Sequence, residues 1–212
     1  MTVIFDLDGT LLDTYQLIRQ NYIDVFAKYL PDHEYDEAEL ESYFGPPLLD
    51  SFLGIVHDEK KARALVRIYR FISKNNTEKY LRTFPDTAEV LRNLREKGFQ
   101  IAVCSNKVHE AVLQGLKVGK IAEFVDLIVG FDDVKKPKPD PEGVMVIQGR
   151  FGGKAVFVGD SPIDIMTAKN AGIKSIGVTW ALTKAKTLRQ AGADYLAESM
   201  KDLEKIMEEM NV

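Results

Sequence analysis

Cysteine is nearly absent from this sequence, which has a single one at position 104. One cysteine cannot form an intramolecular disulfide, and it cannot supply the several thiolates of a structural zinc site. Cys104 stands inside an apolar run with no base near it in the sequence, so we interpret it as a packed side chain rather than a nucleophile. Because scarce cysteine is typical of reducing compartments, we expect a cytoplasmic location.

Long hydrophobic runs are missing as well. The apolar stretch 1–5 is interrupted at once by Asp6 and Asp8, and no basic segment precedes it, so it does not resemble a signal peptide. No run approaches the ~20 apolar residues that cross a bilayer. We therefore expect a soluble protein that is not exported.

The chain also lacks an excess of positive charge. It has 28 Lys and Arg residues against 32 Asp and Glu residues, a formal net charge of −4. We see no cluster of Lys and Arg on one helical face. Nucleic acids and anionic membranes attract basic surfaces, so we expect neither as a partner, whereas a small anionic ligand is compatible with this balance.

What the sequence does have is the composition of a folded globular protein, with 212 residues of which 45% are apolar and 28% charged. Short runs rich in Val, Ile and Phe lie between helical patterns, which predicts an α/β protein with a parallel sheet. The expected strands cover 3–5, 100–104, 127–129, 155–158 and 175–178. Asp86 and Gly98 suggest the N-cap and C′ residues of a helix over 87–97, and Ser161–Pro162 the start of another. Late helices are expected at 182–190 and 199–210.

The segment 15–82 is too long for an ordinary connection between the first two strands. Its apolar spacing is helical throughout, and Pro31 and the turn Gly45–Pro46–Pro47 interrupt it. At about 150 residues per domain, the chain length suggests either one large domain or one core plus an inserted piece. We expect a core formed by 1–14 and 83–212, and a small all-helical domain formed by 15–82.

Polar side chains follow three of the expected strands at the point where each strand ends. Asp6, Asp8 and Gly9 follow the first strand, Ser105 the second, and Asp160 the fourth. Ligands of open parallel sheets bind at this edge. Clustered carboxylates repel one another unless a divalent cation compensates them, and an all-oxygen site suits Mg²⁺. A carboxylate nucleophile, a second carboxyl for proton transfer and Mg²⁺ together indicate phosphoryl transfer.

Two further patterns fit this chemistry. Asp164 follows Asp160 by four residues across a helix start, where it could support a metal ligand or simply cap the helix. Alternate prolines in the segment 135–141 hold lysines in an extended chain, where one cation could neutralise a phosphate, or the segment could be a stiff linker.

Taken together, these motifs resemble the four ordered motifs of the haloacid dehalogenase superfamily. The resemblance rests on Phe5–Leu11 (FDLDGTL), Ser105, the pattern Lys136–Pro137–Lys138–Pro139, and Gly159–Asp160–Ser161 with Asp164. It implies a Rossmann-like three-layer core, and the insert resembles the family's C1 cap. Gly45, Pro46 and Pro47 begin a Gly-Pro-Pro-Leu turn like that of phosphoglycolate-phosphatase-like members, which implies a role in substrate specificity.

The resemblance also implies a role for each matching residue. Asp6 would attack phosphorus and become an aspartyl phosphate, and Asp8 would act as the general acid and base. Mg²⁺ would be held by Asp6, the Asp8 backbone carbonyl and Asp160, with Asp164 supporting them. The phosphate-binding residues would be Thr10, Ser105, Asn106 and Lys136, with Lys138 as the second choice to Lys136.

The expected activity is therefore Mg²⁺-dependent hydrolysis of a small organic phosphate monoester, similar to phosphoglycolate, by a monomer or homodimer. A pyrophosphatase, a nucleotidase and a sugar-phosphate phosphomutase stay open as alternatives within the superfamily. Asp8 favours phosphate chemistry over dehalogenation. The alternative from another class is a phospho-acceptor regulator without catalysis.

Overall fold

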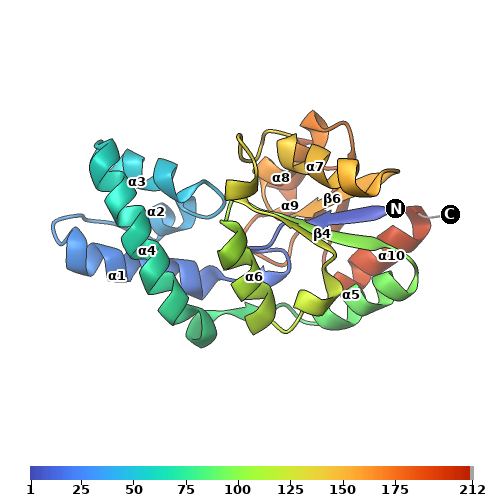
Figure 1. The fold of residues 1–212 in the computed structure, drawn as a ribbon, viewed down its shortest axis with the longest axis horizontal. Helices are drawn as coiled ribbons and strands as arrows, with labels where there is room; N and C mark the ends of the chain where they lie inside the picture. Colours follow the sequence, from blue (N-terminus) through green and yellow to red (C-terminus); the bar gives the residue numbers. More distant parts are fainter. Residues whose placement is uncertain (211–212) are drawn as a thin grey trace. The chain divides into compact units, whose positions relative to one another are not determined.

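The computed structural model describes residues 1–210 of the chain (Figure 1). It divides into two compact units, one formed by Met1–Asp13 together with the chain from Arg82 onward, the other by Thr14–Leu81. Each border lies one residue from the expected range 15–82. The reason is a short antiparallel ribbon, in which β2 (Leu12–Asp13) pairs with β3 (Arg82–Thr83) and keeps Arg82 in the first unit.

The first unit contains a six-stranded sheet in the order β5-β4-β1-β6-β7-β8, and all its neighbouring strands are parallel. This confirms the predicted α/β class. The strands are β1 (Thr2–Phe5), β4 (Gln100–Cys104), β5 (Leu127–Val129), β6 (Ala155–Gly159), β7 (Lys174–Val178) and β8 (Tyr195–Ala197). The sequence did not predict β8, β2 or β3. Strands β2 and β3 have only two residues, too short to show a period, and β8 lacks the aliphatic run that identified the equally short β5.

Helices cover both faces of this sheet. They are α5 (Thr87–Glu96), α6 (His109–Val118), α7 (Glu142–Phe151), α8 (Pro162–Asn170), α9 (Ala185–Ala191) and α10 (Met200–Met210), with 3₁₀ turns η1 (Ala122–Phe124) and η2 (Phe131–Asp133). Figure 1 shows α5, α6 and α10 on one face and α7 and α8 on the other, while α9 packs against α8 and β7. The result is the expected three-layer arrangement.

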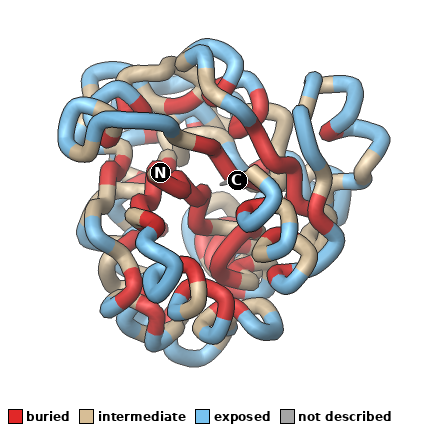
Figure 2. Tube along the Cα trace, turned by 90° about the vertical axis from the view of Figure 1, so that its right-hand side faces the viewer, coloured by how far each residue is buried: buried red, intermediate tan, exposed pale blue. Residues whose placement is uncertain are grey.

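The central strand β1 is buried along its whole length, as Figure 2 shows beside the N-terminus. Its register places Phe5 opposite Val103 of β4 and Val158 of β6. The residues that follow these three strands therefore leave the sheet at one edge. The backbone continues this alignment, because Asp6 N donates to Val158 O at 2.8 Å and Ser105 N donates to Val129 O at 3.0 Å.

Two helix starts were predicted from capping residues. Both helices begin at the expected residue, but only one of them has the expected side-chain cap. At α8, Ser161 and Asp164 form a capping box, in which each side chain accepts from the other's backbone N–H, and Pro162 occupies the first turn. At α5, however, Asp86 adopts a left-handed conformation with φ 63°, and its side chain makes no cap hydrogen bond. Thr87 donates instead to the Phe84 carbonyl at 2.9 Å.

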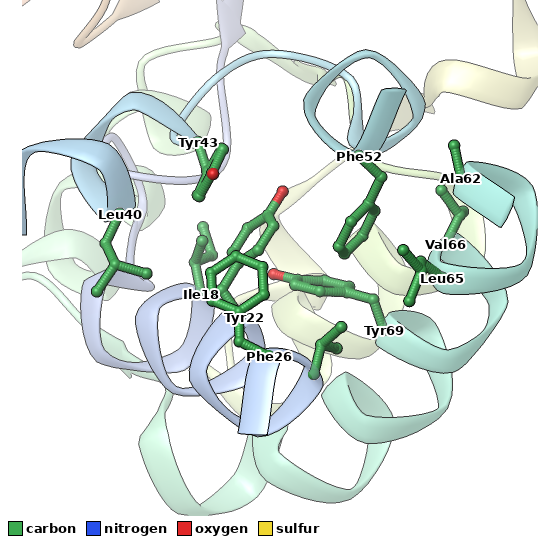
Figure 3. Close-up of a cluster of buried hydrophobic side chains, with 11 residues drawn as sticks. Ile18, Tyr22, Phe26, Leu40, Tyr43, Phe52, Ala62, Leu65, Val66 and Tyr69 are labelled. Carbon is green, nitrogen blue, oxygen red and sulfur yellow. The ribbon is translucent and has the colours of Figure 1, made fainter. Parts of the chain in front are cut away.

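The second unit consists of four helices, α1 (Tyr15–Tyr29), α2 (Glu37–Ser42), α3 (Leu48–Val56) and α4 (Glu59–Tyr80). Tyr22 lies at the centre of its core (Figure 3), with ring centroids 4.3 Å from Tyr43, 5.3 Å from Phe52 and 5.0 Å from Tyr69. Aromatic rings therefore supply much of the buried surface of this small unit. Asn76 of α4 adds a polar link to α1, because its Nδ2 donates to Asn21 and to Asp24, both at 3.0 Å.

The outer face of α4 corrects one argument made from the sequence. Five exposed cations recur at helical spacing along it, Lys60, Arg63, Arg67, Arg70 and Lys74. At 100° per residue they fall within a stripe about 100° wide. A basic helical face is thus present, and the exclusion of anionic macromolecules rests on the net charge alone. No helix among residues 1–210 combines the length and apolar character needed to cross a membrane.

Candidate active site

Three carboxylates meet at the edge of the sheet where β1 and β6 end. Asp6 directly follows β1, Asp160 directly follows β6, and Asp164 lies in the first turn of α8. One oxygen from each residue lies within 4.8 Å of the others. The structure thus brings together three of the four acids that the sequence predicts for the metal site.

Lys138 lies among these acids. Its Nζ is 2.8 Å from Asp6 Oδ1 and 2.6 Å from Asp164 Oδ1, and the residue is only 7% exposed. The sequence preferred Lys136 for this role, whereas the geometry favours Lys138, its second choice. The Lys136 side chain is 75% exposed and lies 4.0 Å from Asp140, and the Lys136 backbone N–H donates to the Glu142 carboxylate at 3.0 Å.

Asn106 explains how Lys138 is held in place. Its Oδ1 accepts from the Lys138 backbone N–H at 2.9 Å, and its Nδ2 donates to the Lys138 carbonyl at 3.2 Å. The side chain expected to bind phosphate therefore clamps both sides of the lysine backbone. With its backbone fixed in this way, Lys138 directs its ammonium group toward Asp6.

The oxygens of Asp164 are fully engaged by the protein. Lys138 donates to Oδ1, while the Ser161 backbone N–H and hydroxyl donate to Oδ2 at 3.1 and 2.6 Å. Asp164 therefore fits the supporting role that the sequence suggests better than that of a direct metal ligand. Asp160 is less engaged than Asp164, since it accepts a long hydrogen bond from the Thr10 hydroxyl, at 3.3 Å.

The donor set fits a hard divalent cation. All the candidate ligands are oxygens, and Gly9 leaves room for the Asp160 carboxylate, since a Cβ on Gly9 would lie 2.6 Å from Asp160 Cγ. Mg²⁺ prefers carboxylate oxygens of this kind. Asp6 and Asp160 are the residues that would hold it.

Burial and mutual repulsion disfavour the ionised forms of these acids. Burial raises the pKa of Asp6 to about 7, and the charges of Asp164 and Asp8 add to this effect while Lys138 opposes it. Burial, followed by the charges of Asp164 and Asp6, also raises the pKa of Asp160 well above its usual range. A cation at this position would relieve the repulsion and favour the ionised carboxylates.

A second lysine, to which the sequence assigned no role, contacts Asp8. Lys107 Nζ lies 2.7 Å from Asp8 Oδ1 and 2.9 Å from Oδ2. The sequence feature that could have identified Lys107 as a site residue was its position two residues after Ser105, at the same sheet edge. Its side-chain direction could not be read from that position.

Ser105 and Thr10, both expected to bind phosphate, are buried. Ser105 is 6% exposed, and its hydroxyl accepts from the Lys107 backbone N–H at 3.2 Å. Thr10 is fully buried and faces Asp160, so it supports the carboxylate rather than presenting a hydroxyl to a ligand. Trp180, which follows β7, holds this loop from the other side by donating from Nε1 to the Thr10 carbonyl at 3.1 Å.

The turn formed by Gly45, Pro46 and Pro47 belongs to the second unit. Gly45 has φ 97°, and Pro47 precedes the first turn of α3. Pro46, Tyr43 and Ser51 are among the residues that line an open hollow of about 470 Å³ in this unit.

A parallel sheet with acids and a buried lysine gathered at the carboxyl ends of its central strands defines an α/β enzyme suited to a phosphorylated substrate. The sequence profile of the haloacid dehalogenase-like hydrolases matches residues 3–178, most of the chain. The chain belongs to this family, and it is a phosphatase of the family.

Similar proteins have names that are consistent with this assignment. Pyrophosphatase PpaX of Bacillus velezensis is 36% identical over 204 residues, which cover 95% of this chain and 93% of that protein. PpaX of Halalkalibacterium halodurans is also 36% identical, with 95% and 94% covered. A crystal structure named a predicted phosphatase, from Clostridium acetobutylicum, superposes with a TM-score of 0.87 at 28% identity and 98% coverage of both chains.

Proposed function

We propose that this protein is a Mg²⁺-dependent phosphatase that acts through an aspartyl phosphate on a small phosphorylated metabolite, with inorganic pyrophosphate as the first candidate. The observation that carries the proposal is the placement of Asp6, at the end of the central strand, against the buried Lys138 and within 4.8 Å of two further acids. A carboxylate held in this way can attack a phosphoryl group whose charge the lysine offsets.

In the proposed reaction, an Asp6 oxygen forms a bond to phosphorus while the bond to the leaving oxygen breaks. Lys138 and Ser105 bind phosphoryl oxygens, and Asp8 gives a proton to the leaving oxygen. Asp8 then takes a proton from the water that hydrolyses the phosphoenzyme. Mg²⁺ held by Asp6, Asp160 and the Asp8 carbonyl would supply charge neutralisation on the phosphoryl oxygens.

Pyrophosphate is placed first because of the relatives' names together with the lysine beside Asp8. Both PpaX relatives are called pyrophosphatases and match almost the whole chain. A small organic phosphate monoester such as phosphoglycolate is the second candidate, and it is supported by the Gly-Pro-Pro-Leu turn that begins at Gly45.

We also propose that the helical unit acts as a cap over the substrate, with Gly45, Pro46 and Pro47 as specificity residues. The chain leaves the first unit after Asp13 and returns at Arg82, and these two residues pair in the β2–β3 ribbon. Because the chain passes between the two units at only these two paired segments, a few residues there could act as a hinge.

The proposal is tested with the purified chain and a panel of pyrophosphate, phosphoglycolate, nucleotides and sugar phosphates, each with Mg²⁺ and with a chelator. We expect pyrophosphate to have the highest kcat/KM, and turnover to stop when the metal is removed. The variant Asp6→Asn should lose turnover of every substrate, because the amide is a far weaker nucleophile, and should keep its circular dichroism spectrum.

Two results would contradict the proposal. Undiminished turnover by Asp6→Asn excludes the aspartyl phosphate. A long-lived phosphorylated species after treatment with acetyl phosphate, seen as a mass increase that persists without turnover of any substrate, indicates the regulator that the sequence left open.

A further inference from the structure

Lys107 is the second cation of the site, and its position is fixed at both ends. Its backbone N–H donates to the Ser105 hydroxyl at 3.2 Å, and its carbonyl accepts from the Phe131 N–H at 2.8 Å. Its ammonium group reaches both oxygens of Asp8, and the two side chains are only 21% and 20% exposed. This partial burial distinguishes the pair from an exposed ion pair, which contributes little.

The two lysines of the site contact different carboxylates. Lys138 contacts Asp6 and Asp164, where the proposed function puts the phosphoryl group that is transferred. Lys107 contacts Asp8, the proposed proton donor to the leaving oxygen. Because Asp8 gives its proton to the leaving oxygen in the proposed reaction, a cation that contacts both oxygens of Asp8 lies on the side of the leaving group.

We propose that Lys107 is a specificity-determining residue that selects substrates whose leaving group carries negative charge. The inference rests on the proposed function and extends it to the leaving group. An anionic leaving group beside Asp8 meets a second negative charge, and the repulsion in a half-buried site is strong unless a cation offsets it. Once Asp8 has passed its proton to the leaving oxygen, Lys107 lies within reach of both anions.

The leaving group defines the substrate class. In pyrophosphate hydrolysis the Asp6–phosphorus bond forms, the bridging P–O bond breaks, and its electron pair stays on a phosphate that takes the Asp8 proton. In phosphoglycolate the leaving alcohol carries a carboxylate. A phosphate ester of glycerol loses a neutral alcohol, and Lys107 has no charge to match there.

The test compares Lys107→Met with the wild-type enzyme on pyrophosphate, phosphoglycolate and glycerol 2-phosphate, all with Mg²⁺. Methionine keeps the length and apolar part of lysine and removes the charge. We expect kcat/KM to fall by about 30-fold or more for the two substrates with anionic leaving groups, the loss typical of truncating one partner of a hydrogen-bonded charge pair. For glycerol 2-phosphate the change should stay within about threefold.

Two matched variants complete the design. Lys107→Arg should recover part of the activity on pyrophosphate, because it restores the charge with another geometry. Lys135→Met removes an exposed lysine from the neighbouring loop and should leave all three values unchanged. Thermal melting of each variant shows whether the fold is kept.

Binding gives a second readout that requires no turnover. Methylenediphosphonate, which cannot be hydrolysed, should bind Lys107→Met about 30-fold more weakly than wild type, while methylphosphonate should bind both equally. An equal loss on all substrates means that Lys107 only orients Asp8 and overturns the inference, as does no loss at all. A wild-type protein that turns over none of the substrates contradicts the proposed function instead.

Discussion

Gly9 combines a left-handed backbone with close contact to a carboxylate of the site. Its φ of 78° lies in the left-handed region, and a Cβ would lie 2.6 Å from Asp160 Cγ. We expect Gly9→Ala to lose about 1 to 2 kcal/mol of unfolding free energy from backbone strain. The variant should also lose Mg²⁺ affinity and activity, because Asp160 must move away. Isothermal titration with Mg²⁺ and denaturant unfolding measure the two effects.

Gly98 provides the matched control for this variant. Its φ of 82° is nearly the same as that of Gly9, but nothing lies within 4 Å of the position of a Cβ. Gly98→Ala should therefore have a similar cost in stability while Mg²⁺ affinity and kcat stay at wild-type values. Loss of Mg²⁺ binding in both variants would show that strain alone, rather than contact with Asp160, disables the site.

At the residue scale, the sequence predicts which side chains gather but not how they point. Asp6, Asp160 and Asp164 could be predicted because strand ends and the first turn of a helix have fixed positions at a sheet edge. The choice between Lys136 and Lys138 could not be made from the sequence, because it depends on two distant contacts. Glu142 accepts from the Lys136 backbone N–H, and Asn106 bonds both sides of the Lys138 backbone.

The segment that follows β4 is hydrogen-bonded to the loop that contains Lys138, and this contact aligns the site. Asn106 follows β4 and makes both hydrogen bonds to the Lys138 backbone. We expect Asn106→Ala to lower kcat/KM by about 10-fold to 100-fold, because Lys138 loses its alignment with Asp6. Unfolding free energy should fall by about 1 kcal/mol. Steady-state kinetics and urea unfolding measure both quantities.

Asn170 tests whether any hydrogen bond to this loop has the same effect. Its Nδ2 donates to the Pro139 carbonyl at 2.9 Å, one residue beyond Lys138, from the end of α8. Asn170→Ala removes one exposed hydrogen bond and leaves the clamp intact. Its kcat/KM should stay within about threefold of wild type, and a loss as large as that of Asn106→Ala would refute the assigned role of Asn106.

The elements themselves were predicted where their pattern is long or strongly apolar. Five strands and the helices between them were recognised from continuous apolar runs, which in the central strands reflect the cover on both sides of the sheet. The edge strands β5 and β8 both have three residues, but β5 is all aliphatic whereas β8 begins with an exposed Tyr195, so only β5 could be recognised. Asp86 occupies the expected position before α5, but its backbone is left-handed and its side chain makes no cap hydrogen bond.

For the whole molecule, the net charge of −4 hides two local concentrations of opposite sign. Acids gather at the sheet edge, where Lys138 and Lys107 offset them only in part. Cations gather along the outer face of α4, where Arg63 pairs with Glu59 at 2.6 Å. Their spacing over fifteen residues kept them from showing as a cluster in the sequence.

The acids at the sheet edge make the stability of the protein depend on pH and on Mg²⁺. The pKa of Asp6 is raised from 3.8 to about 7, so between these values the folded protein holds more protons than the unfolded chain. Stability of the metal-free protein should therefore fall as the pH rises from about 4 to 7, by this contribution. Mg²⁺ binds the ionised carboxylates, so its stabilising effect should grow over the same pH range.

Thermal unfolding between about pH 5 and pH 8, with a chelator and with Mg²⁺, tests this linkage. At an Mg²⁺ concentration 100-fold above Kd, we expect a gain of about 2.7 kcal/mol at the upper end of the range. Asp160→Asn removes one repelling charge together with one ligand, so the metal-free variant should melt at a higher temperature than metal-free wild type at pH 8 and gain little from Mg²⁺. If Mg²⁺ does not change the melting temperature of the wild-type protein at pH 8, the three acids do not form a metal site.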